Sequence, residues 1–169
     1  MRSPYALSIV ALILTGCAGN KTEAPAAAKP AKPIGAVLEI QAPLGLPPVP
    51  IPPDNPPTAE TVALGKKLYF DTNLSADQTL ACASCHSPEK GYTDNAQFSS
   101  GVGGKLGGRN APTVLNAAYN PEQFWDGRAP SLEAQAEGPI ANPVEMNLPH
   151  TEAVKRLNAS AEYKPLFEG

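Results

Sequence analysis

Two cysteines and a histidine stand close together near the middle of the chain, as Cys82-Ala83-Ser84-Cys85-His86. On one helical turn, thiols three residues apart lie on the same side, and the histidine that follows is held beside them. This C-x-x-C-H spacing suits covalent attachment of a haem, with the thiols bonded to its two vinyl groups and the imidazole directed at its iron. The sequence therefore predicts haem c on Cys82, Cys85 and His86, with His86 as the proximal iron ligand.

Three other interpretations of the motif are open. A zinc site needs four ligands, and if Cys17 carries a lipid, only His150 remains to join the motif. A thioredoxin-type disulfide belongs in a βαβ unit, and the sequence shows no βαβ pattern around the motif. A structural disulfide between two cysteines so close on a helix would be strained. Haem attachment is the interpretation that uses all three residues.

The role of such a haem depends on the side of the iron opposite His86. An open position permits small-molecule binding and chemistry, whereas a second strong ligand such as Met or His favours electron transfer. Beyond His86, the residues of these types are Met146 and His150. Two classes of function therefore remain: an enzyme, or a monohaem electron carrier with Met146 as sixth ligand.

Short helices and long loops are expected to position the motif. Thr58 is a candidate N-cap for a helix over 59–69, and a second helix over 80–87 carries the motif. A Gly- and Ser-rich loop is expected over 91–108. Further short helices are predicted over 113–118, 131–137 and 151–158. Since no segment alternates apolar and polar residues, the expected fold class is mainly α, a cytochrome c-like haem domain with short helices and long loops.

The amino-terminal residues have the features of an export signal. Arg2 precedes the apolar stretch 5–14, and Leu14-Thr15-Gly16-Cys17 resembles the lipobox of bacterial lipoproteins. About ten apolar residues are too few to span a bilayer as a permanent helix. We expect a lipoprotein signal peptide over 1–16, lipidation of Cys17, and a periplasmic protein whose membrane contact is that lipid anchor. Ala18 after the cysteine favours the outer membrane, and an ordinary cleaved signal is the alternative.

Composition sets the domain organisation. The 169 residues carry a net charge of −3 and 20 prolines, which fits one modest globular domain after a proline-rich segment. Residues 17–57 are rich in Ala, Pro and Lys, a composition that favours an extended tether, and residues 58–169 form the predicted haem domain. A slightly acidic chain without basic clusters predicts no nucleic-acid partner.

From about Pro43 to its end, the chain resembles the amino-terminal haem domain of bacterial dihaem cytochrome c peroxidases, a family that includes the MauG-type enzymes. The matching runs are PLGLPPVPIPPDNP, LGKKLYFD, LSADQTLACASCH, GGRNAPTVLNAAYNPEQFWDGRAPSLEAQAEGPIANPVEM and YKPLF. In this family the amino-terminal haem is the peroxidatic one. The resemblance implies an oxidoreductase that reduces H2O2 to water with electrons from a small cytochrome c donor. MauG-like oxidation of a protein partner is the alternative within the family.

The resemblance also implies roles for individual residues. Glu145 matches the acid/base residue above the peroxide-binding face, and Gln135 matches the amide that shapes the same pocket. Trp125 matches a tryptophan that lies between two haems and relays electrons. Asn110 matches a contributor to a calcium site at the domain interface, and Arg128 is a candidate partner for a haem propionate. Without the resemblance, each would be an ordinary surface or packing residue.

Two features depart from the family pattern. Val102 stands where many members have a histidine that ligates the peroxidatic iron in the resting state, so the resemblance implies an iron open to peroxide without reductive activation. The sequence ends at Gly169 without a second C-x-x-C-H. We therefore expect either a fragment of a longer protein, or a second haem supplied by a partner. Family members are often dimeric, so a homodimer is expected too.

Overall fold

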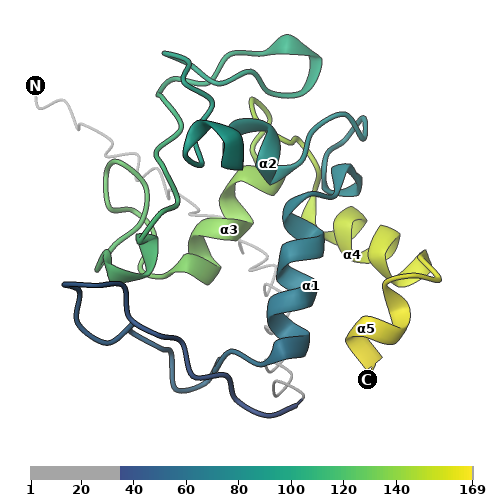
Figure 1. Cartoon of the computed structure of the whole chain (residues 1–169). Coiled ribbons are helices and arrows are strands. Elements are labelled where there is room, and N and C mark those ends of the chain that lie inside the picture. Colours follow the sequence, from purple (N-terminus) through teal and green to yellow (C-terminus); the bar gives the residue numbers. More distant parts are fainter. Residues whose placement is uncertain (1–34, 169) are drawn as a thin grey trace, which may run out of the picture. The chain divides into compact units, whose positions relative to one another are not determined.

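Short helices joined by long irregular segments make up the part of the chain that the structure describes, residues 35–168 (Figure 1). The structure is a computed structural model. Its helices, with η marking a 3-10 helix, are α1 (Ala59–Tyr69), η1 (Thr72–Leu74), α2 (Cys82–Cys85), η2 (Pro88–Lys90), η3 (Val102–Gly104), η4 (Ala117–Tyr119), α3 (Leu132–Ala141), α4 (His150–Ala159) and α5 (Lys164–Glu168). Between residues 35 and 168 extended pairing is limited to isolated bridges. The prediction of a mainly helical fold is confirmed.

The predicted signal peptide 1–16, the lipidated Cys17 and residues 18–34 of the tether lie outside the described residues. No helix between residues 35 and 168 combines the length and the apolar character that a bilayer crossing needs.

Helix α1 has the bounds and the N-cap that the sequence predicts. The Thr58 hydroxyl accepts a hydrogen bond from the Thr61 amide at 3.1 Å, and the Thr61 hydroxyl accepts one from the Thr58 amide at 2.8 Å. This reciprocal capping satisfies two amides that a helix start otherwise leaves unpaired. Lys66 and Lys67 in the last turn complement the helix dipole.

Helix α2, which carries the motif, is shorter than the predicted span 80–87. It is a single turn that begins where the Ala81 amide donates to the Ser84 hydroxyl at 3.0 Å. His86 adopts φ −126° and ψ 60°, outside the helical region, so the helix ends before Ser87. The two cysteines nevertheless share one turn, as their spacing predicts.

The predicted helix over 113–118 is wrong for most of its length. The Thr113 hydroxyl donates to the Gly91 carbonyl at 2.6 Å and accepts from the Leu115 amide at 3.2 Å. The local bond from the Leu115 amide competes with helix formation, and the bond to Gly91 fixes Thr113 to a distant segment. Asn116 then takes a left-handed conformation, with φ 59°, so that only the short η4 forms.

Helix α3 extends beyond the predicted 131–137, whereas α4 matches its prediction within one residue at each end. The Ser131 hydroxyl caps α3 by accepting from the Ala134 amide at 3.2 Å. The helix continues through Pro139, whose carbonyl accepts from the Met146 amide at 3.1 Å. The chain that returns after α3 thus supplies donors to its last carbonyls, which otherwise lack partners. Helix α5 was not predicted.

The described residues form a small hydrophobic core where α4 meets η1 and α3 (Figure 1). Its buried members are Leu74, Met146, Leu148 and Ala153, and Leu68, Ile140 and Leu157 pack against them. Several large apolar side chains remain exposed instead, among them Trp125 at 63%. The core lies beside the segment that leads into α2 and does not include the two cysteines.

One arginine of α4 fastens the loop that leads into the motif. The Arg156 guanidinium donates to the carbonyls of Asn73 at 3.1 Å, Ser75 at 2.8 Å and Ala76 at 3.1 Å. The Ala76 amide donates in turn to the Met146 carbonyl at 2.8 Å. Arginine suits this task because its planar fork presents several donors at once. The approach to α2 is therefore fixed to α4 and to the core.

The described part of the proline-rich segment is tied to the helical part at several points. The Leu38 amide donates to the Pro57 carbonyl at 2.8 Å. The Tyr119 hydroxyl donates to the Pro47 carbonyl at 2.8 Å, and the Asn55 amide group donates to the Glu133 carboxylate at 2.9 Å. Residues 38–57 thus run along the surface of the domain.

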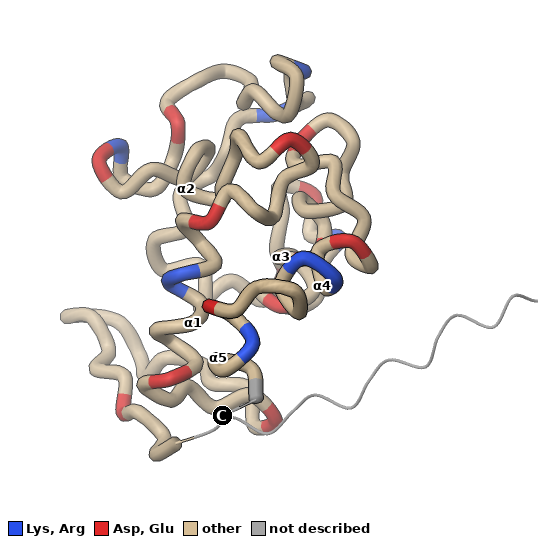
Figure 2. Tube along the Cα trace, turned by 90° about the vertical axis from the view of Figure 1, so that its right-hand side faces the viewer, with Lys and Arg blue, Asp and Glu red and all other residues tan. Residues whose placement is uncertain are grey.

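Acidic and basic residues are scattered over the described chain (Figure 2). Lys67 of α1 pairs with Glu162, just before α5. Exposed ion pairs of this kind contribute little to stability. The packing of α5 near the end of α1 therefore depends more on a buried contact nearby.

That contact joins Tyr163 to Asp71. Tyr163 is 1% exposed, and its hydroxyl donates to the Asp71 carboxylate. Burial by itself raises the pKa of Asp71, but hydrogen bonds from Tyr163 and Asn73 outweigh it, so the pKa of Asp71 is lowered. The hydrogen bond is therefore strongest when Asp71 is ionised.

We expect Tyr163→Phe to lower the free energy of unfolding by about 1.5–3 kcal/mol at pH 7, the usual range for a hydrogen bond to a charged group. A lowered folded-state pKa contributes stability above the unfolded pKa of about 4, and this contribution is lost as pH falls through the folded value. The difference between variant and wild type in urea unfolding should therefore shrink towards pH 3. An equal difference at both pH values would contradict the assignment.

Candidate functional site

The imidazole of His86 is held by main-chain carbonyl groups. Its Nδ1 lies 3.0 Å from the Pro112 oxygen and 3.3 Å from the Tyr92 oxygen. Since both oxygens only accept hydrogen bonds, they favour the neutral tautomer that has its proton on Nδ1 and its lone pair on Nε2. A metal-binding histidine typically donates its second ring N–H to a carbonyl in this way. The residues present therefore fit a haem whose iron is bound by His86.

Cys82 and Cys85 are free thiols on the same turn. Burial raises the pKa of both, and at Cys85 the charges of Asp94 and Glu145 raise it further, while the Ser99 hydroxyl acts in the opposite direction. Both thiols are neutral at pH 7, whereas zinc ligation and disulfide exchange use thiolates. The raised pKa values therefore favour neither of these two alternatives.

Tyr69, the last residue of α1, also contacts the motif. Its hydroxyl donates to the His86 carbonyl at 2.5 Å, and its ring lies 6.4 Å from that of Tyr92. Burial raises the pKa of Tyr69 to about 12, so the hydroxyl is a donor at neutral pH. No spacing pattern in the sequence indicates this contact.

Glu145 lies near the motif and is held by the end of α3. The Asn142 side-chain amide donates to Glu145 Oε1 at 2.7 Å, and the charge of Glu145 contributes to the raised pKa of Cys85. A half-buried carboxylate with one oxygen fixed can accept and return a proton at a defined place. The structure thus brings Glu145 to the neighbourhood of the predicted haem, and it adds Asn142, which the sequence analysis missed.

Val102 lies against the main chain of Glu145. The Val102 amide donates to the Glu145 carbonyl at 2.8 Å. The preceding Gly101 is buried, and a Cβ added there would overlap the carbonyl oxygen of Val144 and lie 2.7 Å from that of Glu145. Only glycine allows this close approach of two backbone segments.

We expect Gly101→Ala to lower the free energy of unfolding by about 1–3 kcal/mol, as overpacking does, and to separate Val102 from Glu145. Gly108→Ala is the matched control, because nothing lies near a Cβ added at Gly108 and its φ is not positive. Thermal or urea unfolding of both variants measures the effect. Equal stability of the two variants would contradict the close approach at Gly101.

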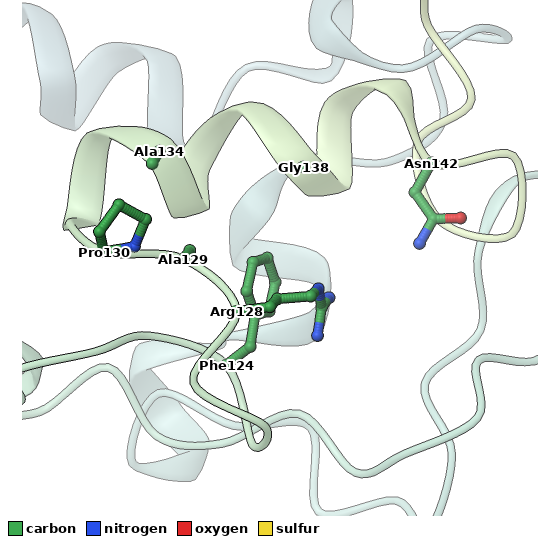
Figure 3. Close-up of a pocket in the computed structure, with 7 residues that line it drawn as sticks. All are labelled: Phe124, Arg128, Ala129, Pro130, Ala134, Gly138 and Asn142. Atoms are coloured by element: carbon green, nitrogen blue, oxygen red, sulfur yellow. The ribbon is translucent and has the colours of Figure 1, made fainter.

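A pocket of about 370 Å3 opens between α3 and the loop before it (Figure 3). Its walls are formed by Phe124, Arg128, Ala129, Pro130, Ala134, Gly138 and Asn142. Because Asn142 also binds Glu145, the pocket adjoins the carboxylate just described. A cavity of this size suits a small ligand or part of a cofactor.

The ring of Phe124 forms one wall of this pocket. The Arg128 guanidinium lies 3.5 Å from the ring centroid, and a Cβ added to Gly138 would lie 3.0 Å from the Phe124 ring (Figure 3). Phe124 has φ 67°, an unusual conformation for a bulky residue. Such strain is maintained only where the surroundings enforce it, and it is common at functional sites. The sequence analysis did not single out Phe124.

Gln135 lies on α3 three residues before Gly138 and seven before Asn142, so the three share a helix face. It is half-buried. Gln135 is not among the residues that line the pocket, so its role in shaping a peroxide-binding site stays a prediction.

Trp125, Asn110 and Arg128 are exposed, and the first two contact each other. Trp125 Nε1 donates to the Asn110 carbonyl at 2.9 Å, and the Asn110 side chain donates to the Ala96 carbonyl at 2.6 Å. Arg128 pairs with Asp126 at 2.7 Å, and Arg109 pairs with the same carboxylate at 3.1 Å. Among residues 35–168, acidic, His and Cys side chains do not gather in a metal-holding group of three or more. The calcium role of Asn110 and the propionate role of Arg128 stay predictions.

The two candidate sixth ligands are engaged elsewhere. Met146 is 5% exposed and belongs to the core with Leu74 and Leu148. His150 Nε2 lies 2.8 Å from the Glu137 carbonyl, which gives it a partner on α3. Neither arrangement favours the electron-carrier interpretation.

Comparison with known proteins agrees with these features. A family model described as di-haem cytochrome c peroxidase matches residues 59–169. Cytochrome c peroxidase Ccp of Escherichia coli is 48% identical over 119 residues, which cover 70% of this chain and 26% of that protein. Methylamine utilization protein MauG of Methylorubrum extorquens is also 48% identical over 119 residues, covering 70% of this chain and 34% of the relative.

Solved structures are similar too. A MauG-like protein associated with microbial copper homeostasis superposes with a TM-score of 0.68 at 35% identity, over 75% of this chain and 38% of that one. The diheme peroxidase BthA of Burkholderia thailandensis gives a TM-score of 0.58 at 28% identity, over 62% and 31% of the two chains. The chain spans between a quarter and two fifths of the length of these relatives.

Proposed function

The chain belongs to the di-haem cytochrome c peroxidase family, and we propose that it forms the peroxidatic haem domain of an enzyme that reduces H2O2 to water. Membership of this family implies haem c as the cofactor. Cys82 and Cys85 would hold the haem covalently and His86 would bind its iron. The observation that carries this proposal is the pair of carbonyls at His86 Nδ1, because they leave Nε2 free for a metal.

When bound, the haem would supply the redox chemistry at its iron. Glu145 takes a proton from the near oxygen of H2O2 and returns it to the far oxygen, so that the O–O bond breaks with water as the leaving group. Asn142 holds the carboxylate in place at 2.7 Å. Gln135 binds peroxide or water by hydrogen bonds and does not compete as a strong ligand. Two electrons and two protons complete the conversion of H2O2 to two waters.

Electrons come from a small cytochrome c or a similar donor, through a second haem domain or a partner, and Trp125 relays them. The exposure of Trp125, at 63%, suits a residue that faces another haem-bearing unit. Asn110, whose carbonyl holds the indole, contributes to a calcium site at the same boundary, and Arg128 pairs with a propionate. A homodimer is part of the proposal.

Export and anchoring follow from the amino terminus. Residues 1–16 act as a lipoprotein signal, Cys17 carries the lipid, and residues 17–57 connect it to the haem domain 58–169. The protein would then work in the periplasm at the outer membrane. Covalent haem attachment, which takes place outside the cytoplasm, supports the same location.

An alternative within the family is oxidation of residues on a protein partner, for which the similarity to MauG is the supporting observation. Steady-state turnover separates the two. A peroxidase consumes H2O2 in proportion to oxidised cytochrome c, whereas a MauG-like enzyme oxidises a protein substrate and leaves cytochrome c largely unused.

Electron paramagnetic resonance and absorption spectra of the ferric protein test the open site. With Val102 near Glu145 in place of a histidine, we expect high-spin iron that peroxide perturbs. A wholly low-spin, six-coordinate iron that does not respond to peroxide would contradict the proposal. A sulfur-to-iron charge-transfer band that disappears in Met146→Ala would favour the electron carrier instead.

A further inference from the structure

Two tyrosines lie on the His86 side of the motif and take no part in the proposed peroxide chemistry. Tyr69 ends α1, and Tyr92 lies just after η2. Their ring centroids are 6.4 Å apart, and Phe70 meets the Tyr69 ring edge-on at 5.1 Å. The side of the motif that carries His86 is therefore supported by an aromatic cluster.

The hydroxyl of Tyr69 reaches the main chain of His86 directly. It donates to the His86 carbonyl at 2.5 Å, across seventeen residues of sequence. His86 has left the helical conformation, with ψ 60°, so its carbonyl is not used by a continuing helix. The Tyr69 hydroxyl satisfies this carbonyl and fixes the backbone on which the imidazole is mounted.

The ring of Tyr69 also supports one of the two carbonyls that hold the imidazole. Tyr92 has φ 61°, which a bulky residue adopts only where its surroundings enforce it. Its amide donates to the Ser87 carbonyl at 2.8 Å, and its own carbonyl lies 3.3 Å from His86 Nδ1. Packing between the two tyrosine rings helps to hold this turn, so Tyr69 acts on both the backbone and the side chain of His86.

The hydrogen bond at Nδ1 decides how strongly an imidazole donates electrons to a metal. A firmly held N–H···O=C bond makes the other ring nitrogen more basic, and greater donation lowers the reduction potential of a haem iron. A loosened bond therefore raises the potential and weakens the bond between iron and imidazole.

We propose that Tyr69 is a positioning residue for the proximal histidine: its hydroxyl and ring fix His86 so that Nδ1 stays bonded to the carbonyls of Tyr92 and Pro112. The inference rests on the proposed function, because it requires a haem on His86. Tyr69 touches neither peroxide nor iron in this scheme. It tunes the iron through His86 alone.

The test is Tyr69→Phe, which keeps the ring and removes the hydroxyl. We expect the haem to remain covalently attached, the iron–imidazole stretching band of the ferrous protein in resonance Raman spectra to move to lower frequency, and the reduction potential to rise. Tyr119→Phe is the matched control. It removes a hydroxyl that likewise donates to a main-chain carbonyl, that of Pro47 at 2.8 Å, and it should change neither quantity.

A second variant guards against a general loss of structure. Para-aminophenylalanine at position 69 restores an N–H donor on the same ring and should return the band to its wild-type frequency. An unmoved band in Tyr69→Phe, an equal movement in Tyr119→Phe, or no return with the amino variant would each overturn the positioning role. A wild-type chain without covalent haem would instead overturn the proposed function, and haem staining of a denaturing gel separates the two failures.

Discussion

Replacing Cys82 and Cys85 together with alanine is expected to reduce covalently bound haem to nearly zero and to abolish peroxidase activity. Both thiols lie on the single turn of α2, and His86 follows directly. Each thiol forms one bond to the haem, so single variants should retain one attachment and carry less haem than the wild type. Haem staining after denaturing electrophoresis and the intact mass of the chain measure the result.

Cys17→Ala is the matched control, because Cys17 is the one cysteine of the chain that lies outside the motif. It should leave the haem in place and move the protein from the membrane fraction to the soluble fraction. A double variant that still carries haem through a denaturing gel would refute the attachment at Cys82 and Cys85. Haem loss in Cys17→Ala would indicate that the effect comes from failed export.

Glu145→Gln is expected to lower kcat/KM for H2O2 by about 10²–10⁴, the usual contribution of a positioned acid or base. Glutamine has nearly the same size as glutamate, and its side-chain oxygen can still accept a hydrogen bond from Asn142. In the wild type this bond is 2.7 Å long. The glutamine amide cannot pick up the peroxide proton. The haem spectrum and the folding stability should therefore stay close to those of the wild type.

Glu137→Gln is the control for this change, because Glu137 is an exposed carboxylate on α3, the helix that precedes Glu145. It should leave turnover unaltered. Stopped-flow mixing with H2O2 separates the chemical step from electron delivery. A Glu145→Gln variant that reacts with peroxide as fast as the wild type would rule out proton transfer by Glu145.

Some features of the fold could be predicted because their causes lie within a few residues. The N-cap at Thr58 and the bounds of α1 depend on a hydroxyl three residues from its partner amide. The long loops follow from the abundance of Gly and Pro, and the mainly helical character was predicted because no segment alternates apolar and polar residues. The helix over 113–118 failed because Thr113 finds its partner at Gly91, 22 residues away, and no local pattern records that contact.

The candidate site divides in the same way. Spacing alone was enough to identify Cys82, Cys85 and His86 as a predicted haem-attachment motif. The resemblance to a known family then added Glu145 and Gln135. Phe124 and Asn142 were not found, since a left-handed phenylalanine and an amide at a helix end carry no signature until the chain has folded.

By itself, the sequence determined the chemistry of attachment, because two thiols and an imidazole within five residues need only one helical turn to converge. Only the tertiary structure decided how His86 is held, because its partners at Pro112 and Tyr69 lie 26 and 17 residues away. It also decided which groups meet Glu145, because the approach of Gly101 to that segment depends on backbone contact between distant loops. Residue spacing and capping determine the local structure. The environment that tunes a metal ligand depends on contacts between distant segments, which form only when the chain folds.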